Sequence, residues 1–247
     1  MSALLETVGL TRFFGAVRAA EDLNVRVEEG EIVGIIGSNG SGKTTFLNLA
    51  TGYLKPERGR ILLAGRDTTT LSPRLITRLG VARSFQIPQL YLGLTVLENL
   101  LLSLAARSDQ IGVWATLHRA HWTTEAGNTL AQFGLEEHAQ RRVGELPEGG
   151  RKLLDIAVAV ARRPRLLLMD EPTAGVSTED KFEVMDTLVG VLRGSGITTL
   201  FVEHDMDVVQ RYSRRVIVFD QGLVIADGEP AAVLGDADVR RAVLGHV

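Results

Sequence analysis

The segment "GSNGSGKTT", Gly37 to Thr45, carries the clearest chemistry in the chain. Its first eight residues fit the pattern G-x-x-x-x-G-K-[ST] at every position. The segment follows the apolar run "EIVGII" and precedes "FLNLATGYL", which is typical of a helix. Glycines allow a backbone to approach a phosphate closely, and the following helix adds its positive N-terminal end. The pattern therefore predicts a phosphate-binding loop, with a glycine-rich turn of no chemical role as the alternative.

Each residue of this loop has an expected part in holding a nucleotide. We expect Lys43 to bridge the β- and γ-phosphates and the Thr44 hydroxyl to ligate Mg²⁺. The residues expected to contact the nucleotide here are Gly37, Ser38, Asn39, Gly40, Ser41, Gly42, Lys43, Thr44 and Thr45.

Two carboxylates end a second apolar run, "LLLMDE". Asp170 is placed to hold the magnesium shell, and Glu171 to polarise an attacking water as a general base. The alternative is the solvated edge of a buried sheet, which is common where such strands end. The phosphate loop favours the catalytic interpretation.

His204 and Gln86 are the remaining polar candidates. His204 closes the run "TTLFVEH", where it can contact a γ-phosphate and position the water, although a lone histidine is usually structural. Gln86, in "RSFQIP", comes just before a helical stretch. It is either an ordinary surface residue or a residue at a functional seam.

These residues need a parallel sheet to bring them together. Three continuous apolar runs, Glu31–Ile36, Arg165–Asp170 and Thr198–His204, read as buried parallel strands, each followed by a turn and a helical pattern. Such an alternation predicts an α/β fold with functional groups at the carboxyl ends of the strands.

Two further regions flank this core. Leu4 to about Val27 and the segment "GRILLAG" alternate more, which predicts an antiparallel β layer on one side of the sheet. Between about Ile87 and Arg163 the pattern becomes helical, which predicts an inserted helical lobe.

Composition narrows the function classes. The chain has 247 residues, 45% of them hydrophobic, and a formal net charge of -3, so nothing draws it generally to nucleic acid or to an anionic membrane. It has no cysteine, which excludes disulfides, thiol catalysis and zinc–thiolate sites. The start lacks a secretory pattern, and the longest apolar tract, "LTVLENLLLSLAA", is too short for a bilayer, so we expect a cytosolic chain.

Taken in order, Phe14, "GSNGSGKTT", Gln86, "LPEGG", "LLLMDEP" and "EHD" resemble the nucleotide-binding subunit of an ATP-binding cassette (ABC) transporter. The resemblance covers essentially the whole chain. Within that family the chain is most similar to the ATPase of high-affinity branched-chain amino acid importers, on "FQIPQLYLGLTVLENLL", "DEPTAGV", "VEHDMDVV" and the tail "VLGDADVRRAVLGHV".

The resemblance implies a fold and a division of the chain. The fold is a P-loop NTPase (RecA-like) α/β core with an antiparallel β subdomain and an inserted helical subdomain. The whole chain, 1–247, would be a single nucleotide-binding domain. Its core and β layer would take 1–86 and 164–230, the helical subdomain 87–163 and a C-terminal tail 231–247.

The resemblance also implies cofactors and site roles. The cofactors are ATP and Mg²⁺. Phe14 would stack on adenine, although a half-buried aromatic of the β layer would look the same in sequence. Gln86 would join Thr44 and Asp170 at the magnesium site and assist Glu171 and His204 in catalysis. Gly149 would contact the nucleotide of a partner cassette.

The implied partners place the chain at a membrane. A second cassette, identical or different, would pair with it head to tail, and transmembrane permease subunits would bind the pair on the cytoplasmic face of the inner membrane. A solute-binding protein would act with it indirectly, and no nucleic acid would take part. The apolar residues Ile87, Leu90, Tyr91 and Leu92 would line a groove for a permease helix, or else pack in the core.

One motif departs from the family pattern. The signature is usually Leu-Ser-Gly-Gly-Gln, whereas this chain has "LPEGG" at Leu146–Gly150. Pro147 offers neither a hydroxyl nor a backbone N–H, and Glu148 adds a negative charge that opposes a phosphate. The motif's usual contact with a γ-phosphate is therefore in question.

Three functions follow from these features. The leading one is an ATP-hydrolysing motor subunit of an importer for branched-chain amino acids or related small polar solutes. The second is a nucleotide-gated regulatory or adaptor cassette with little turnover, which the altered signature favours. The third, a soluble cassette of DNA repair or ribosome control, lacks support because the chain has neither a long coiled coil nor a second cassette.

Overall fold

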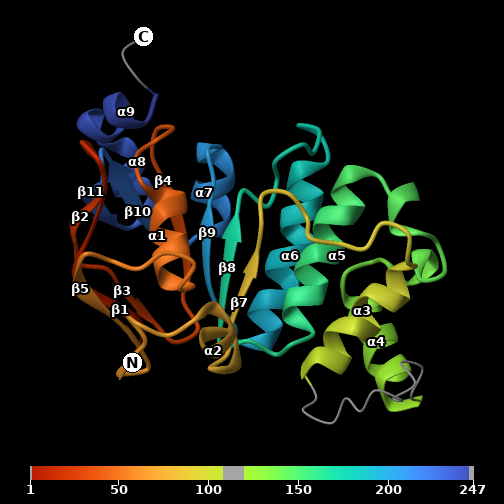
Figure 1. Ribbon diagram of the computed structural model, residues 1–247. Helices are drawn as coiled ribbons and strands as arrows, with labels where there is room; N and C mark the ends of the chain where they lie inside the picture. The colour runs from red at the N-terminus through yellow and green to blue at the C-terminus, as the bar shows by residue number, and fades with distance from the viewer. Residues whose placement is uncertain (1, 108–119, 245–247) are drawn as a thin grey trace.

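A computed structural model describes residues 2–107 and 120–244 of the chain. Its centre is a six-stranded sheet in the order β11–β10–β4–β9–β8–β7 (Figure 1). The five strands from β10 to β7 are parallel, and β11 pairs with β10 antiparallel. The strands are β4 (Ile32–Ile36), β7 (Val81–Ser84), β8 (Leu166–Asp170), β9 (Thr198–Val202), β10 (Arg215–Asp220) and β11 (Leu223–Gly228).

A second, antiparallel sheet lies on one side of the first. Its strands are β1 (Ala3–Phe14), β2 (Val17–Leu23), β3 (Arg26–Glu28), β5 (Arg58–Leu63) and β6 (Arg66–Asp67). Strand β1 pairs with β2, β3 and β5, so one long strand holds the layer together. The predicted β layer is therefore confirmed.

The helices occupy the space around the sheets. In Figure 1, helices α3, α4 and α5 gather at the right, away from the antiparallel sheet. The helical elements are α1 (Lys43–Ala50), α2 (Pro73–Arg78), α3 (Val96–Arg107), α4 (Ala120–Gln132), η1 (Glu136–His138), η2 (Val143–Glu145), α5 (Glu148–Val160), α6 (Lys181–Ser195), α7 (Met206–Tyr212), α8 (Pro230–Gly235) and α9 (Ala237–Leu244). The division of the chain at 86/87, 163/164 and 230/231 stays a prediction.

Within the described residues, no helix combines the length and the apolar character that crossing a membrane requires.

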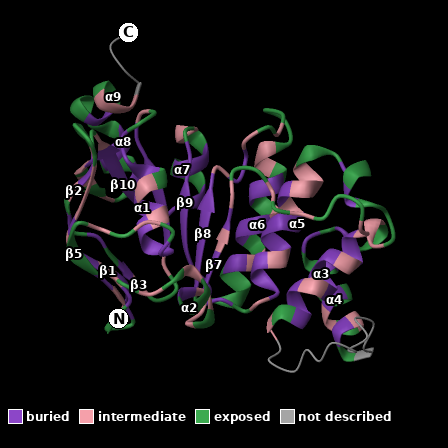
Figure 2. Cartoon of the chain, viewed as in Figure 1, coloured by how far each residue is buried: buried purple, intermediate pink, exposed green. Residues whose placement is uncertain are grey.

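The central strands are buried on both faces, as their purple colour in Figure 2 shows. In β8, Leu166 and Leu168 pack in one apolar cluster with α1 and the β layer, whereas Leu167 and Met169 pack in another with α5 and α6. A strand that is buried on both faces has a continuous run of apolar residues, whereas a strand with one solvated face alternates apolar and polar residues. This is why "EIVGII", "RLLLMD" and "TTLFVEH" could be assigned as strands from sequence.

Three strands of the central sheet were not among the sequence predictions. Strand β7 reads "VARS", with two polar residues in four, and β10 and β11 form a hairpin after the last predicted strand. The predicted run Thr198–His204 was also too long as a strand. Strand β9 ends at Val202, so His204 lies in the loop that follows it.

The two-sided burial of β8 generates a stability prediction. Leu168 is fully buried, so Leu168→Ala should lower the free energy of unfolding by about 3 kcal/mol through lost burial and a cavity. Leu75→Ala is the matched control, because Leu75 on α2 is 43% exposed and alanine suits a helix. It should change that free energy by less than about 0.5 kcal/mol. Urea unfolding of both variants checks this, and equal losses would contradict the assigned core.

Candidate functional site

The phosphate loop, residues 37–42, joins β4 to α1. Gly37 has a φ of 153°, and a Cβ there would collide with the backbone oxygen of Phe219. Gly42 has a φ of 107°, and a Cβ there would collide with the backbone oxygen of Ala19. Both positions therefore require glycine for conformation and for space. The loop is pressed between β10 and β2, which fixes its shape.

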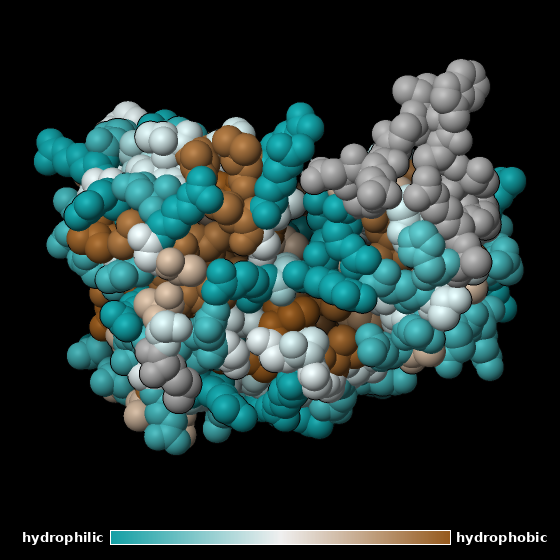
Figure 3. All heavy atoms as spheres, turned by 90° about the horizontal axis from the view of Figure 1, so that it is seen from below, coloured by the Kyte–Doolittle hydropathy of each residue, from teal (hydrophilic) through white to brown (hydrophobic). Residues whose placement is uncertain are grey.

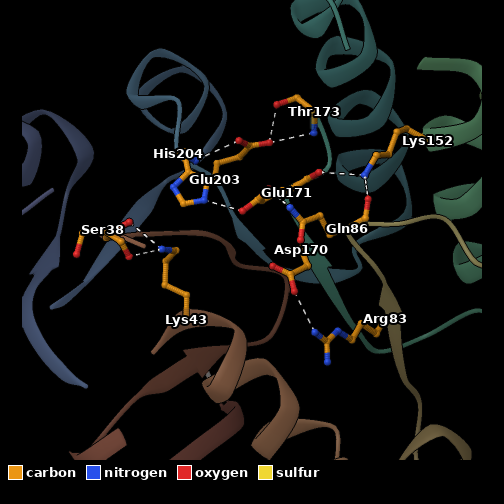
Figure 4. Close-up of polar contacts among 11 residues, drawn as sticks. Ser38, Lys43, Arg83, Gln86, Lys152, Asp170, Glu171, Thr173, Glu203 and His204 are labelled. Atoms are coloured by element: carbon orange, nitrogen blue, oxygen red, sulfur yellow. Dashed lines mark hydrogen bonds and ion pairs between the residues drawn. The ribbon is translucent and has the colours of Figure 1, made fainter. Parts of the chain in front are cut away.

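Lys43 is buried at the first position of α1 and folds back over the loop. Its Nζ donates to the backbone oxygens of Gly37, at 2.7 Å, and Ser38, at 2.9 Å (Figure 4). Burial lowers the pKa of the Lys43 ammonium, and the nearby carboxylates of Glu171 and Asp170 oppose that shift. A cation is thus held over the loop, bonded only to neutral carbonyls.

Two hydroxyls beside Lys43 differ in exposure. The Ser41 Oγ is buried and has no hydrogen-bond partner among the described residues, whereas Thr44 is exposed. A buried polar atom without a partner is uncommon and points to a group that binds there.

The carboxylates lie at the end of β8. Asp170 is its last residue, and its Oδ2 accepts from a guanidinium nitrogen of Arg83 at 3.0 Å. Glu171 comes next with a φ of 52°, which is unusual for a residue with a side chain. Its backbone N–H donates to the oxygen of Val202 at 3.0 Å, which ties this strained turn to β9.

The three predicted catalytic residues are in direct contact, as Figure 4 shows. The Glu171 Oε1 lies 2.6 Å from the Nε2 of His204, and its Oε2 accepts from the Nε2 of Gln86 at 2.7 Å. The three side chains come from the loops that follow β8, β9 and β7, which are neighbours in the sheet. The sequence placed Glu171 and His204 at strand ends and Gln86 only before a helical stretch, and the topology brings all three together. Their catalytic roles stay predictions.

Two charged residues that the sequence did not single out, Lys152 and Arg83, hold neighbouring parts of the site. The Nζ of Lys152, on α5, donates to the backbone oxygens of Gln86 and, at 3.3 Å, Glu171. Burial lowers the pKa of Lys152, and nearby carboxylates oppose this. Arg83, on β7, holds Asp170. A lysine in a helix usually faces solvent, so nothing in the sequence marks Lys152.

Glu203 forms a second link between the loops after β8 and β9. Its Oε1 accepts from the backbone N–H of Thr173 at 3.0 Å and from the Thr173 hydroxyl at 2.7 Å. Its Oε2 accepts from the backbone N–H of His204 at 3.2 Å. Burial raises the pKa of Glu203, and these hydrogen bonds oppose that shift. The only sequence signal was its place beside His204.

The oxygen donors predicted for magnesium suit a hard cation. They are the Thr44 hydroxyl, the Asp170 carboxylate and Gln86, whose amide nitrogen already faces Glu171 and whose oxygen is left for another partner. Among the described residues, no three histidine, cysteine or acidic side chains gather into a metal cage. A cation held together with nucleotide phosphates needs only one or two such ligands from the protein, so these residues fit Mg²⁺.

Two further predicted nucleotide contacts come from β1 and α5. Phe14, at the end of β1, is 44% exposed, and the guanidinium carbon of Arg12 lies 5.0 Å from its ring centroid. Gly149 lies in the first turn of α5, and α5 and α1 lie on opposite sides of the central sheet (Figure 1). In the described residues no hydrogen bond joins Gly149 to the phosphate loop.

The altered signature begins α5. Pro147 precedes the helix and Glu148 opens it, and both are exposed. The Glu148 carboxylate rests against Gly175, whose φ is 79°, and a Cβ at Gly175 would collide with it. Gly175 follows Glu171 by four residues, so the signature touches the turn that carries Glu171 within one chain.

The apolar stripe near the helical lobe is mostly exposed. Ile87, Tyr91 and Leu92 are 74%, 64% and 54% exposed, whereas Leu90 is partly buried against the core. Core packing therefore accounts for Leu90 alone.

A groove of about 540 Å³ opens near this stripe, and Tyr91 is the one stripe residue that lines it. Its lining also includes Tyr53, Ile76, Arg83, Phe85, Asp155 and Val158. Seen from below, the molecule exposes apolar side chains among hydrophilic ones near the middle of the face (Figure 3).

Comparison with known proteins adds two kinds of match. The family model described as "ABC transporter" matches residues 20–174. The branched-chain amino acid transport ATP-binding protein LivG of Escherichia coli K12 is 37% identical over 254 residues, covering 98% of each chain. A probable LivG of Archaeoglobus fulgidus is 36% identical and covers 98% of this chain and 95% of its own.

Solved structures agree with these relatives. The ADP conformation of MJ1267, an ATP-binding cassette of an ABC transporter, superposes with a TM-score of 0.89 at 31% identity over the full length of both chains. MJ0796, a cassette solved as a dimer bound to ADP and phosphate, gives a TM-score of 0.78 at 26% identity, covering 92% of this chain and 98% of its own. With its phosphate loop, paired carboxylates and matching fold, this chain belongs to the ABC transporter family of ATP-binding cassettes.

Proposed function

We propose that the chain is the ATP-hydrolysing motor subunit of an importer for branched-chain amino acids or related small polar solutes. The observation that carries this is the contact of Glu171 with both His204 and Gln86, beside an intact phosphate loop. The LivG relatives, named for branched-chain amino acid transport, support the substrate class.

Binding of nucleotide begins at the loop. Phosphate oxygens replace the backbone oxygens of Gly37 and Ser38 as partners of Lys43, because a charge-assisted hydrogen bond is stronger than a neutral one. The loop N–H groups and the start of α1 add further donors. Thr44, Gln86 and Asp170 would hold Mg²⁺, which would supply positive charge beside the phosphates.

Turnover then depends on the carboxylate of Glu171. It orients the attacking water and accepts its proton, while His204 faces the γ-phosphate and keeps the water in line. The strained backbone at Glu171 and the carbonyl contact from Lys152 hold the carboxylate in place.

The working unit has more than one chain. Gly149 begins α5, which lies on the opposite side of the central sheet from α1, so it serves a nucleotide held by a partner cassette, in a homodimer or heterodimer. Transmembrane permease subunits bind the exposed stripe and groove, which places the pair on the cytoplasmic face of the inner membrane, where a solute-binding protein acts with it indirectly.

A nucleotide-gated adaptor with little turnover is the second candidate. The specific observation in its favour is the exposed Pro147–Glu148 pair at the start of α5, which offers a partner's γ-phosphate a negative charge and no hydroxyl. Magnesium-dependent phosphate release, measured with and without the permease, separates the two candidates. Release stimulated by the permease supports the motor, and binding without release supports the adaptor.

Glu171→Gln should keep nucleotide binding and block hydrolysis. The amide fills the same space but cannot accept a proton, so turnover should fall by about a hundredfold or more while ATP affinity stays within about threefold. Glu179→Gln, an exposed glutamate in the turn before α6, is the control and should hydrolyse normally. Phosphate release together with ATP titration provides the measurement, and normal hydrolysis by Glu171→Gln would place the base elsewhere.

Lys43→Ala should weaken ATP binding by about ten- to a hundredfold, because it removes a charged hydrogen-bond donor from the phosphates. Lys55→Ala is a matched control, since the Lys55 Nζ also donates to a backbone oxygen, that of Leu71, outside the loop. Direct calorimetric titration of both variants gives the affinities. Equal affinities for wild type and Lys43→Ala would rule out the assigned phosphate site.

The altered signature should make the assembled transporter asymmetric, with this chain paired to a different cassette. The site built on this chain's loop, Glu171 and His204 should turn over normally. The site that receives "LPEGG" should be weaker by about 1.5 to 3 kcal/mol, one hydrogen bond to an anion. Backbone N–H groups near Gly149 and Gly150 could offset this loss.

The reconstituted complex tests the asymmetry. Glu171→Gln in this chain should abolish most turnover, the equivalent change in the partner should cost less, and Pro147→Ser should raise the rate. If Glu171→Gln and the equivalent change in the partner reduce turnover equally, or if Pro147→Ser leaves turnover unchanged, the two sites are equivalent and the asymmetric scheme is wrong.

A further inference from the structure

Arg83 is a buried cation that the proposed mechanism does not use. It lies on β7, and its side chain is 6% exposed, next to the 7% exposed side chain of Asp170. One guanidinium nitrogen donates to the Asp170 Oδ2 at 3.0 Å, and another donates to the Asn48 Oδ1 on α1 at 2.6 Å. The guanidinium carbon lies 4.7 Å from the ring centroid of Phe85. Three contacts therefore fix the plane of one side chain.

A buried ion pair is expensive to desolvate and is weak evidence of a role in stability. Replacing such a pair with apolar residues often leaves stability unchanged or increases it. The presence of this pair therefore calls for a reason other than stability. Its geometry offers one. Arg83 occupies only Oδ2, and among the described residues no hydrogen bond reaches Oδ1.

Figure 4 places Asp170 between Arg83 and the side of the site that holds Lys43. We propose that Arg83 is a positioning residue that holds Asp170 so that Oδ1 is presented to the magnesium–nucleotide complex. This inference rests on the proposed function, because it takes Asp170 as the magnesium-shell residue. Asn48 and Phe85 serve as the anchors that keep the guanidinium in place.

Arg83 has two opposing effects on a bound cation. Its positive charge repels Mg²⁺, whereas its hydrogen bond keeps the carboxylate from rotating away. Asn48→Ala separates the two, because it removes an anchor of the guanidinium without changing any charge. If Arg83 positions Asp170, nucleotide affinity in Asn48→Ala should depend less on Mg²⁺. If Arg83 acts only through its charge, that dependence should not change.

The measurement is the affinity of the isolated chain for the non-hydrolysable β,γ-imido analogue of ATP, titrated with Mg²⁺ and again with EDTA. The ratio of the two affinities is the magnesium-dependent gain. Arg83→Met should reduce this gain about tenfold and Asn48→Ala about threefold, which are losses of the order of one charged or one neutral hydrogen bond. Affinities in EDTA should stay within about twofold, because the loop itself is intact.

Matched variants keep the result interpretable. Arg162→Met is the control, since Arg162 lines the same groove as Arg83 but has no acidic partner among the described residues, and its gain should not change. Arg83→Lys keeps the charge but lacks the planar fork whose separate nitrogens bind Asn48 and Asp170, so it should lose part of the gain. If Arg83→Met does not fold, Asn48→Ala and Arg83→Lys carry the test.

Asp170→Asn is the reference variant for loss of the magnesium ligand, and it should lose the magnesium-dependent gain in affinity. If it does, while Arg83→Lys and Asn48→Ala keep or increase theirs, the positioning role is overturned and the proposed function stands. If Asp170→Asn itself keeps the gain, the magnesium assignment of the proposed function fails, and the role of Arg83 fails with it.

Discussion

The parallel pairing of β4, β9, β8 and β7 is the constraint on which the site depends. Neighbouring strands lie about 4.8 Å apart, so loops that leave the same edge of four adjacent strands must share a small volume. The phosphate loop, His204, Glu171 and Gln86 leave these strands in that order. Gln86 and Glu171, which are 85 positions apart in the chain, meet because the strands that precede them are paired side by side in this sheet.

Much of this arrangement was predictable from local pattern. The phosphate loop and the residues at the ends of β8 and β9 follow continuous apolar runs, and burial on both faces produces such runs. Strand β7 could not be predicted, because "VARS" mixes polar and apolar residues. Its arginine is buried only because Asp170 lies opposite, 87 positions away. Lys152 could not be predicted for the same reason. It is buried because it donates to backbone oxygens far away in the chain, which the sequence of its own helix does not reveal.

The signature region adds an unexpected contact inside the chain. Glu148 rests on Gly175, and the turn from Glu171 to Gly175 is closed by the N–H of Ala174, which donates to the oxygen of Glu171 at 3.1 Å. The start of α5 and the catalytic turn therefore press on each other directly. A change at position 148, which we propose faces a partner's nucleotide, therefore also acts on the turn that carries this chain's own Glu171.

The left-handed backbone of Glu171, with its φ of 52°, has an evolutionary consequence. A side chain in that conformation costs of the order of 1 to 3 kcal/mol, and glycine would remove the cost. Glycine has no carboxylate, so under the role proposed for Glu171, stability and hydrolysis make opposite demands on this position. Stabilising this chain without loss of that carboxylate therefore requires changes elsewhere, in the two apolar clusters or on the surface, while the strain at position 171 stays.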